Sequence, residues 1–142
     1  MEKLLLEFVD TLDLSLKRLQ KEVGVGSGIA KLTISQLQYI DAIDVLGKPT
    51  ITEIADKLNI TKSSTTIGVN KLIKMGYVQK TQSSEDKRVF HVTLTGSGRQ
   101  LVNAKYQALK EYGDFIRSAL SEDEAMHFER TITKLVKLFK SI

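Results

Sequence analysis

Hydroxyl, amide and cationic side chains share one face of a helix that the sequence predicts from Thr61 to about Met75. Hydroxyls can bond base edges or phosphates, an amide suits adenine, an aliphatic group suits the thymine methyl, and lysines neutralise phosphates. The outward and flanking residues are Lys62, Ser63, Ser64, Thr66, Ile67, Asn70, Lys71 and Lys74. These residues could contact DNA, although an ordinary solvated helix face is the alternative for such a composition.

The other face of this helix is apolar. Thr61 is a good N-cap, and Gly76 can adopt the left-handed conformation that ends a helix. The inward positions recur at three- and four-residue spacing and are Thr65, Val69, Leu72 and Ile73. A second helix must therefore pack against this stripe.

That second helix is predicted immediately upstream. Thr50 and Glu53 form a capping box directly after Pro49, which marks a helix start. The apolar stripe of this helix is Ile54, Ala55 and Leu58. Residues 59–61 then form a tight turn, so the two helices make a helix-turn-helix unit.

A charged β-hairpin is predicted after the helix pair. Its strands are Val78 to Thr81 and Arg88 to Leu94, and the second strand alternates in the period of two that is typical of a half-buried strand. The tip, residues 82–88, is too polar to belong to a core.

With this hairpin the chain resembles the MarR family of winged helix-turn-helix transcription regulators, whose wing carries an Asp-x-Arg signature. The matching residues are Asp86, Lys87 and Arg88, together with Leu32-Thr33, Gln36, Ile54-Ala55, Leu58 to Thr66, Val92, Leu94, Thr95 and Gly98. The resemblance covers most of the chain, and the ordered combination is specific although no single motif is.

The resemblance implies that Arg88 enters a minor groove, that Lys87 beside it contacts DNA, and that Asp86 orients Arg88. A narrow A·T minor groove has an enhanced negative potential that attracts a guanidinium, and a carboxylate two residues earlier can restrict that side chain in advance. The alternative is that Asp86 and Arg88 form an ordinary exposed ion pair that contributes little.

Net charge is concentrated in the same segment. Residues 61–90 carry six positive and two negative side chains, a net charge of +4, which equals that of the whole chain. The remaining residues therefore balance, fifteen against fifteen. This distribution is expected of a protein that meets a polyanion with one surface.

Both ends of the chain are predicted to be helical, and Ser121 with Glu124 predicts a capping box at the start of the last helix. Residues 95–120 form either one helix or a helix interrupted near Gly113. In the MarR family such helices interlock with those of a second subunit; an intramolecular bundle is the alternative. The predicted dimerisation residues are Leu5, Phe8, Leu12, Leu16, Phe128, Ile132, Leu135 and Phe139.

Composition argues against several functions. The absence of cysteine excludes disulfides and thiol chemistry. His91 and His127 lie on different predicted elements, so no metal site or other cofactor is expected.

No nucleophile has a base and an orienting group nearby in sequence, so catalysis is not expected. No run of about 18 apolar residues and no signal peptide is present, which predicts a cytoplasmic protein without contact to a membrane.

Two positions depart from the family pattern. Family recognition helices often carry a basic residue where Ile67 stands, so contact with a thymine methyl is expected there instead of guanine readout. Gly68 stands where a larger aliphatic residue is usual, and a mid-helix glycine costs about 1 kcal/mol relative to alanine. Either a neighbouring helix approaches closely at Gly68 or the helix is locally soft.

The expected fold is mainly α with a small β-hairpin wing: a winged helix-turn-helix with N- and C-terminal dimerisation helices. The expected domains are an N-terminal dimerisation helix and linker (1–32), the DNA-binding domain (33–94) and C-terminal dimerisation helices (95–142). The expected function is that of a transcriptional regulator, a ligand-responsive repressor, which binds a pseudo-palindromic operator in double-stranded DNA as a homodimer.

The resemblance also implies a small, often aromatic or anionic, effector between the dimerisation helices and the DNA-binding part. A winged-helix adaptor that binds a protein partner through its hairpin is the alternative function. An adaptor predicts an apolar exposed helix face, and only Ile67 fits that prediction.

Overall fold

The computed structural model describes residues 1–23 and 31–142. Across these residues helices predominate and the two strands pair in one antiparallel sheet. The elements in chain order are α1 (Glu2–Val23), α2 (Ile34–Leu46), α3 (Ile51–Leu58), α4 (Lys62–Lys74), β1 (Val78–Gln82), β2 (Phe90–Leu94), α5 (Gly96–Ala119) and α6 (Glu122–Lys140). The predicted fold class, mainly α with a hairpin wing, is confirmed.

Local capping determines where the helices begin. Thr50 and Glu53 form the predicted capping box of α3, with distances of 2.8 and 3.2 Å between the paired atoms. Ser121 and Glu124 do the same for α6. Asn59 ends α3 in the left-handed conformation with φ of 54°. Because these bonds satisfy backbone groups that a helix end leaves unpaired, they fix where each of these helices begins or ends.

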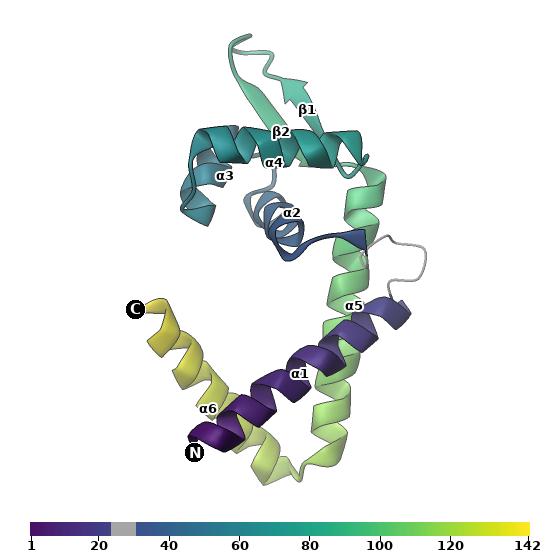
Figure 1. The fold of residues 1–142 in the computed structure, drawn as a ribbon, viewed down its shortest axis with the longest axis vertical. Helices are drawn as coiled ribbons and strands as arrows, with labels where there is room; N and C mark the ends of the chain where they lie inside the picture. The colour runs from purple at the N-terminus through teal and green to yellow at the C-terminus, as the bar shows by residue number, and fades with distance from the viewer. Residues whose placement is uncertain (24–30) are drawn as a thin grey trace.

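One apolar core holds the helix-turn-helix, the hairpin and the first turns of α5 together. Figure 1 shows these elements gathered in the upper half of the molecule. The fully buried side chains include Ile40, Ile43, Ile54, Val69, Leu72, Val78, Val92 and Leu101. Burying one such side chain contributes about 1.5 to 3 kcal/mol. This cluster can therefore keep the upper half folded and position the polar face of α4.

Tyr39 explains the unusual glycine in α4. A Cβ atom at Gly68 would overlap the Tyr39 ring, and the Tyr39 hydroxyl donates a hydrogen bond to the Ser64 carbonyl oxygen at 3.2 Å. Of the two explanations for Gly68, close approach of a neighbouring helix is the one observed, and that helix is α2.

Helix α5 leaves the core and carries the lower half of the molecule. It packs along α1, and α6 folds back from its lower end (Figure 1). Arg99 and Lys105 of α5 form ion pairs with Asp44 and Asp41 of α2. These pairs tie the upper part of α5 to α2.

The start of α5 is also joined to the base of the hairpin. The Thr95 hydroxyl donates to the Gly76 carbonyl oxygen and the Thr95 amide to that of Tyr77. A Cβ atom at Gly98 would overlap the Tyr77 carbonyl group. The hairpin base and the first turn of α5 are therefore in direct backbone contact.

Both strands of the hairpin differ from their predicted bounds, and the first strand ends at Gln82 and not at Thr81. The second strand begins at Phe90 and not at Arg88, because Val89 donates its amide hydrogen to the Asp86 carbonyl oxygen and closes a turn there. Of the two alternatives for residues 95–120, one continuous helix is observed: α5 runs through Gly113, since a mid-helix glycine lowers helix stability without breaking the backbone hydrogen bonds.

Candidate nucleic-acid interface

The exposed face of α4 brings the predicted contact residues together. Lys62, Ser63, Ser64, Asn70, Lys71 and Lys74 are exposed, as is Ile67, whose exposed fraction is 58%. Thr66 is half-buried. Thr65, Val69 and Leu72 are buried on the opposite face, as their spacing predicted. The packing of α4 therefore turns its polar side chains outward as a group.

Hydrogen bonds at α4 determine which donors and acceptors of the Ser64 and Thr66 hydroxyl groups remain available to a partner. The Thr66 hydroxyl donates to the Lys62 carbonyl oxygen at 2.9 Å, so its lone pairs remain as acceptors. The Ser64 hydroxyl oxygen lies 3.0 Å from that of Thr61, and the Thr61 oxygen accepts from the Ser64 amide. Ser64 thus contributes to the cap of α4, whereas Thr66 presents an acceptor and a methyl group.

Lys80 is a polar residue of this surface that the sequence did not single out. Its ammonium group donates to Oδ1 of Asn70 at 3.2 Å, which links β1 of the hairpin to α4. In the sequence Lys80 is only one more positive charge in a basic segment. Nothing in its spacing reveals which helix residue it reaches, because that depends on how the hairpin packs on α4.

The tip of the hairpin holds Arg88 in a defined orientation. Nε and Nη2 of Arg88 donate to the two carboxylate oxygens of Asp86 at 3.1 and 3.0 Å, and the Arg88 amide donates to Oδ1 at 3.0 Å. The Arg88 side chain is 89% exposed. The arginine is therefore restricted by its carboxylate yet open to an external partner.

The bonds from Arg88 also affect ionisation. The side-chain and backbone hydrogen bonds from Arg88 lower the pKa of Asp86 below its ordinary value of 3.8. In turn, the hydrogen bond with Asp86 raises the pKa of Arg88. Both groups remain charged at neutral pH, so the pair persists under the conditions in which DNA would be bound.

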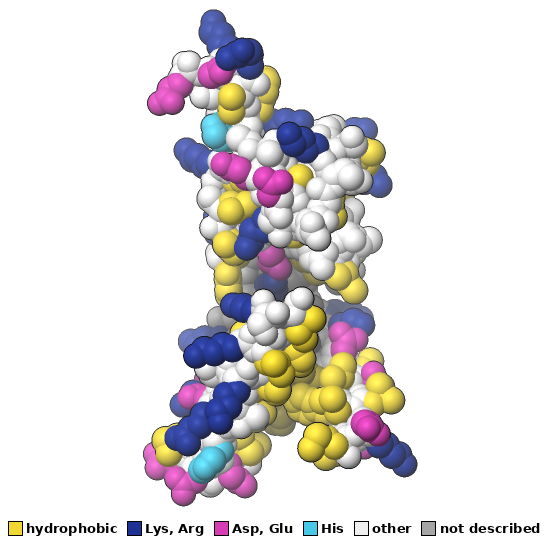
Figure 2. Space-filling view, turned by 90° about the vertical axis from the view of Figure 1, so that its left-hand side faces the viewer, with side chains coloured by type: hydrophobic (Ala, Val, Ile, Leu, Met, Phe, Trp, Pro, Cys, Tyr) yellow, Lys and Arg dark blue, Asp and Glu magenta, His cyan; other side chains and the backbone are white. Residues whose placement is uncertain are grey.

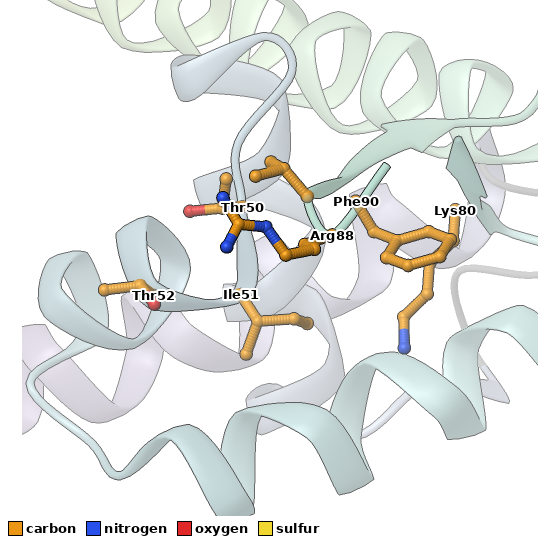
Figure 3. Close-up of a pocket in the computed structure, with 7 residues that line it drawn as sticks. Thr50, Ile51, Thr52, Lys80, Arg88 and Phe90 are labelled. Atoms are coloured by element: carbon orange, nitrogen blue, oxygen red, sulfur yellow. The ribbon is translucent and has the colours of Figure 1, made fainter. Parts of the chain in front are cut away.

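A cavity of about 450 Å³ lies between the hairpin and the start of α3, and Lys80 and Arg88 line it together with Thr50, Thr52 and Phe90 (Figure 3). Lys80, which lines this cavity, also bonds to Asn70 of α4. Lys80 therefore links the hairpin that carries Arg88 to the exposed face of α4.

The predicted dimerisation residues lie on α1 and α6, away from this surface. Leu5, Phe8, Ile132, Leu135 and Phe139 are exposed, whereas Leu12 and Phe128 are half-buried. The Leu16 side chain falls outside the described part of the chain. Figure 2 shows hydrophobic side chains gathered over the lower half of the molecule, where these two helices lie.

Both histidines contact backbone carbonyl groups. Nδ1 of His91 lies 2.8 Å from the Lys48 carbonyl oxygen, and Nδ1 of His127 lies 2.7 Å from that of Asp123. Within residues 1–23 and 31–142, no three histidine, aspartate or glutamate side chains are grouped so as to hold a metal ion. Among the helices that the structure describes, none is both long and apolar enough to cross a membrane.

Comparison with known proteins shows what this chain resembles. The MarR family model matches residues 32–90. An uncharacterized HTH-type transcriptional regulator of Bacillus subtilis, YhjH, is 28% identical over 124 residues, which cover 85% of this chain and 69% of that protein. The HTH-type transcriptional regulator PapX of Escherichia coli is 33% identical over 90 residues, which cover 63% of this chain and 55% of PapX. The chain thus spans only about half the length of PapX.

Solved structures show the same fold. Streptococcus pneumoniae FabT, crystallised in complex with DNA, superposes with a TM-score of 0.79 at 22% identity over 99% of both chains. RV1404 of Mycobacterium tuberculosis gives a TM-score of 0.83 at 18% identity, over 96% of this chain and 90% of that one. Residues 32–90 thus match the MarR family model, and the fold of the described chain matches those of FabT and RV1404.

Proposed function

We propose that the protein is a sequence-specific DNA-binding transcriptional regulator. The observation that carries this proposal is the bond between Lys80 of the hairpin and Asn70 on the outward polar face of α4, in a hairpin whose Arg88 guanidinium donates two hydrogen bonds to Asp86. A helix of this kind fits a major groove, and an exposed guanidinium beside it fits the adjacent minor groove. Because the carboxylate already restricts Arg88, less side-chain entropy is lost when DNA binds.

The residues proposed to contact DNA divide by chemistry. Thr66, Ile67 and Asn70 lie at the centre of the exposed face and are the proposed base readers, with Ser63 beside them. Lysines supply phosphate contacts, which position a protein on the duplex without reading its sequence. The proposed phosphate-contacting lysines are Lys62, Lys71, Lys74 and Lys87.

Homodimerisation follows from the exposed apolar faces of α1 and α6. No side chain described on α6 is buried in the single chain, and Phe139 is 67% exposed. A contiguous apolar surface of this kind marks a protein interface. A two-fold pair of chains would present two α4 helices to a pseudo-palindromic operator.

The relatives support the same function. YhjH and PapX are described as transcriptional regulators, and the FabT structure contains DNA. Regulators of transcription are not enzymes, and they act on chromosomal DNA, so we place the protein in the cytoplasm. The match to the MarR family model also supports a repressor that responds to a small aromatic or anionic effector.

Selection from random duplex DNA at about 150 mM salt tests the proposal, because specific binding must survive screening of phosphate contacts. Enrichment of a motif with two related half-sites is the expected result. Recovery of no motif would contradict the proposal and favour a protein-binding adaptor, for which exposed Ile67 is the supporting observation.

A further inference from the structure

The bond between Lys80 and Asn70 determines which way the Asn70 amide faces. A lysine ammonium has three hydrogen-bond donors and no acceptor, so only the amide oxygen can face it. The Lys80 Nζ to Asn70 Oδ1 distance of 3.2 Å satisfies this requirement. The amide nitrogen, which carries two hydrogens, is then the atom left to face a partner.

This orientation changes what Asn70 can recognise. An asparagine that reads adenine uses its oxygen to accept from N6 and its nitrogen to donate to N7. With Lys80 in place, a positive charge lies beside the amide oxygen and repels the amino group of adenine or cytosine. The Lys80 and Asn70 side chains together present donors: the amide hydrogens and the remaining ammonium hydrogens.

Guanine is the base whose major-groove edge matches a pair of donors. It offers two adjacent acceptors, N7 and O6, whereas adenine offers one acceptor beside a donor. We propose that Lys80 is a positioning residue that turns Asn70 from an adenine reader into a guanine reader. This inference rests on the proposed function and names a specificity determinant within it.

The hairpin places Lys80 for this role. Lys80 pairs with Val92 across the two strands, and Val92 is fully buried, so the backbone of β1 at Lys80 is fixed by the core. Figure 3 shows the Lys80 side chain leaving the strand beside Phe90, with its ammonium group pointing away from the strand. Phe90 and Lys80 line the same cavity, so the aromatic ring limits where the lysine stem can go.

A phosphate contact is the competing role for Lys80. A lysine that only neutralises a phosphate lowers affinity for every sequence when it is removed and leaves the preferred motif unchanged. A lysine that orients Asn70 changes the preferred base at one position in each half-site.

The test compares the wild type with Lys80→Met, Asn70→Ala and Lys80→Arg in the selection described above. The position that loses its preference in Asn70→Ala is the base pair that Asn70 reads. Isotherms are then measured on two duplexes that carry guanine or adenine at that position. Lys74→Met is the matched control, because Lys74 is an exposed lysine of the same surface that no described bond links to Asn70.

The wild type should prefer guanine by roughly tenfold, and Lys80→Met should lose or reverse that preference. Lys80→Arg keeps a donor and a charge and should retain the preference. Lys74→Met should weaken binding to both duplexes by the same factor. Circular dichroism of each variant should match the wild type, since both lysines are exposed.

Equal weakening of both duplexes by Lys80→Met would assign Lys80 to a phosphate and overturn the inference. A wild-type preference for adenine at the Asn70 position would overturn it as well. If the wild type enriches no motif at all, the proposed function itself fails, and that result is distinct from a motif that Lys80→Met leaves unchanged.

Discussion

The upper and lower halves of the molecule differ in how far a single chain buries their apolar side chains. In the helix-turn-helix and hairpin, Ile40, Ile43 and Ile54 are almost completely buried within one chain. In α6 none of the described side chains is buried, and on α1 Leu4 is 70% exposed. The upper half therefore holds its own fold, whereas the apolar residues of the lower half need a second surface to cover them.

This contrast assigns separate roles to the two halves. The upper half has the buried contacts that a rigid reading surface needs, and on α4 and the hairpin its exposed residues are polar or charged apart from Ile67 and Phe90. The lower half has exposed apolar residues whose burial can provide association energy. Substitutions in one half should therefore leave the fold of the other half intact, and this separation can be tested.

Charges introduced into the lower half should have the largest effect. In Leu135→Lys combined with Phe139→Lys, burial of an unpaired charge against a partner chain costs about 3 to 5 kcal/mol per site. We expect a single-subunit mass of about 15.9 kDa in light scattering, and loss of operator binding at concentrations that saturate the wild type. The far-ultraviolet circular dichroism should still show a helical fold.

Thr131→Lys is the control for that pair, because Thr131 is an exposed residue of the same helix. It should leave the mass at two subunits. A wild-type protein that already scatters as one subunit would end the dimer proposal and with it the contrast between the halves.

Gly68→Ala should destabilise the fold of the upper half and leave dimerisation unchanged. The added methyl group meets the Tyr39 ring, and overpacking of this kind costs about 1 to 3 kcal/mol, against a gain of about 1 kcal/mol in helix propensity. We expect a net loss in the free energy of unfolding, measured by urea denaturation, with the dimer retained at micromolar concentration. Tyr39→Leu in the same chain should recover part of the loss.

Gly113→Ala provides a matched control in α5. A Cβ atom at Gly113 meets nothing within 4 Å, so the same substitution should raise the free energy of unfolding by up to about 1 kcal/mol. Equal effects at both glycines would mean that contact with Tyr39 does not constrain α4.

Arg88→Ala should alter DNA binding without disturbing either half. In a plot of log affinity against log salt concentration, each lost phosphate contact reduces the magnitude of the slope by about 0.9. For a dimer, which loses one contact per subunit, the magnitude of the slope should therefore fall by roughly two. Arg88→Lys should recover only part of the affinity, because a hydrated ammonium enters a narrow groove less readily.

Asp86→Ala should act in the same direction as Arg88→Ala but more weakly, and the double variant should be little worse than Arg88→Ala. Additive losses would show that Asp86 acts independently of Arg88. Unchanged binding in Arg88→Ala would remove the hairpin from the DNA interface.

The smallest expected effect concerns pH. The pKa of Asp86 is lowered in the folded protein, so the ion pair is fully present above the ordinary value of 3.8 and is lost as pH falls through the lowered value. The contribution of the hairpin to binding should therefore be constant from about pH 5 to 8. An NMR titration of the Asp86 carboxyl group should show a lower midpoint in the wild type than in Arg88→Ala.

Local features of the fold could be predicted from the sequence, because each depends on residues a few positions apart. The capping boxes of α3 and α6, the turn at Asn59 and the buried stripe of α4 are of this kind. The Asp86 and Arg88 pair is also local, since its members are two positions apart.

Contacts between distant elements could not be predicted in the same way. The Tyr39 ring meets Gly68 because α2 and α4 pack at one particular distance, and the sequence showed only that Gly68 was unusual. Lys80 reaches Asn70 because the hairpin folds toward α4. Both contacts require the relative placement of elements, which local spacing does not determine.

The junction between the hairpin base and α5 has a mechanical consequence. With Thr95 bonded to Gly76 and Tyr77, and Gly98 against the Tyr77 carbonyl group, the hairpin base and the first turn of α5 are expected to move as one rigid joint. The 24 residues of α5 extend roughly 36 Å from that joint. In the proposed dimer, helix α5 would act as a lever, and a small tilt where two chains meet would move each Arg88 toward or away from the minor groove that we propose it enters.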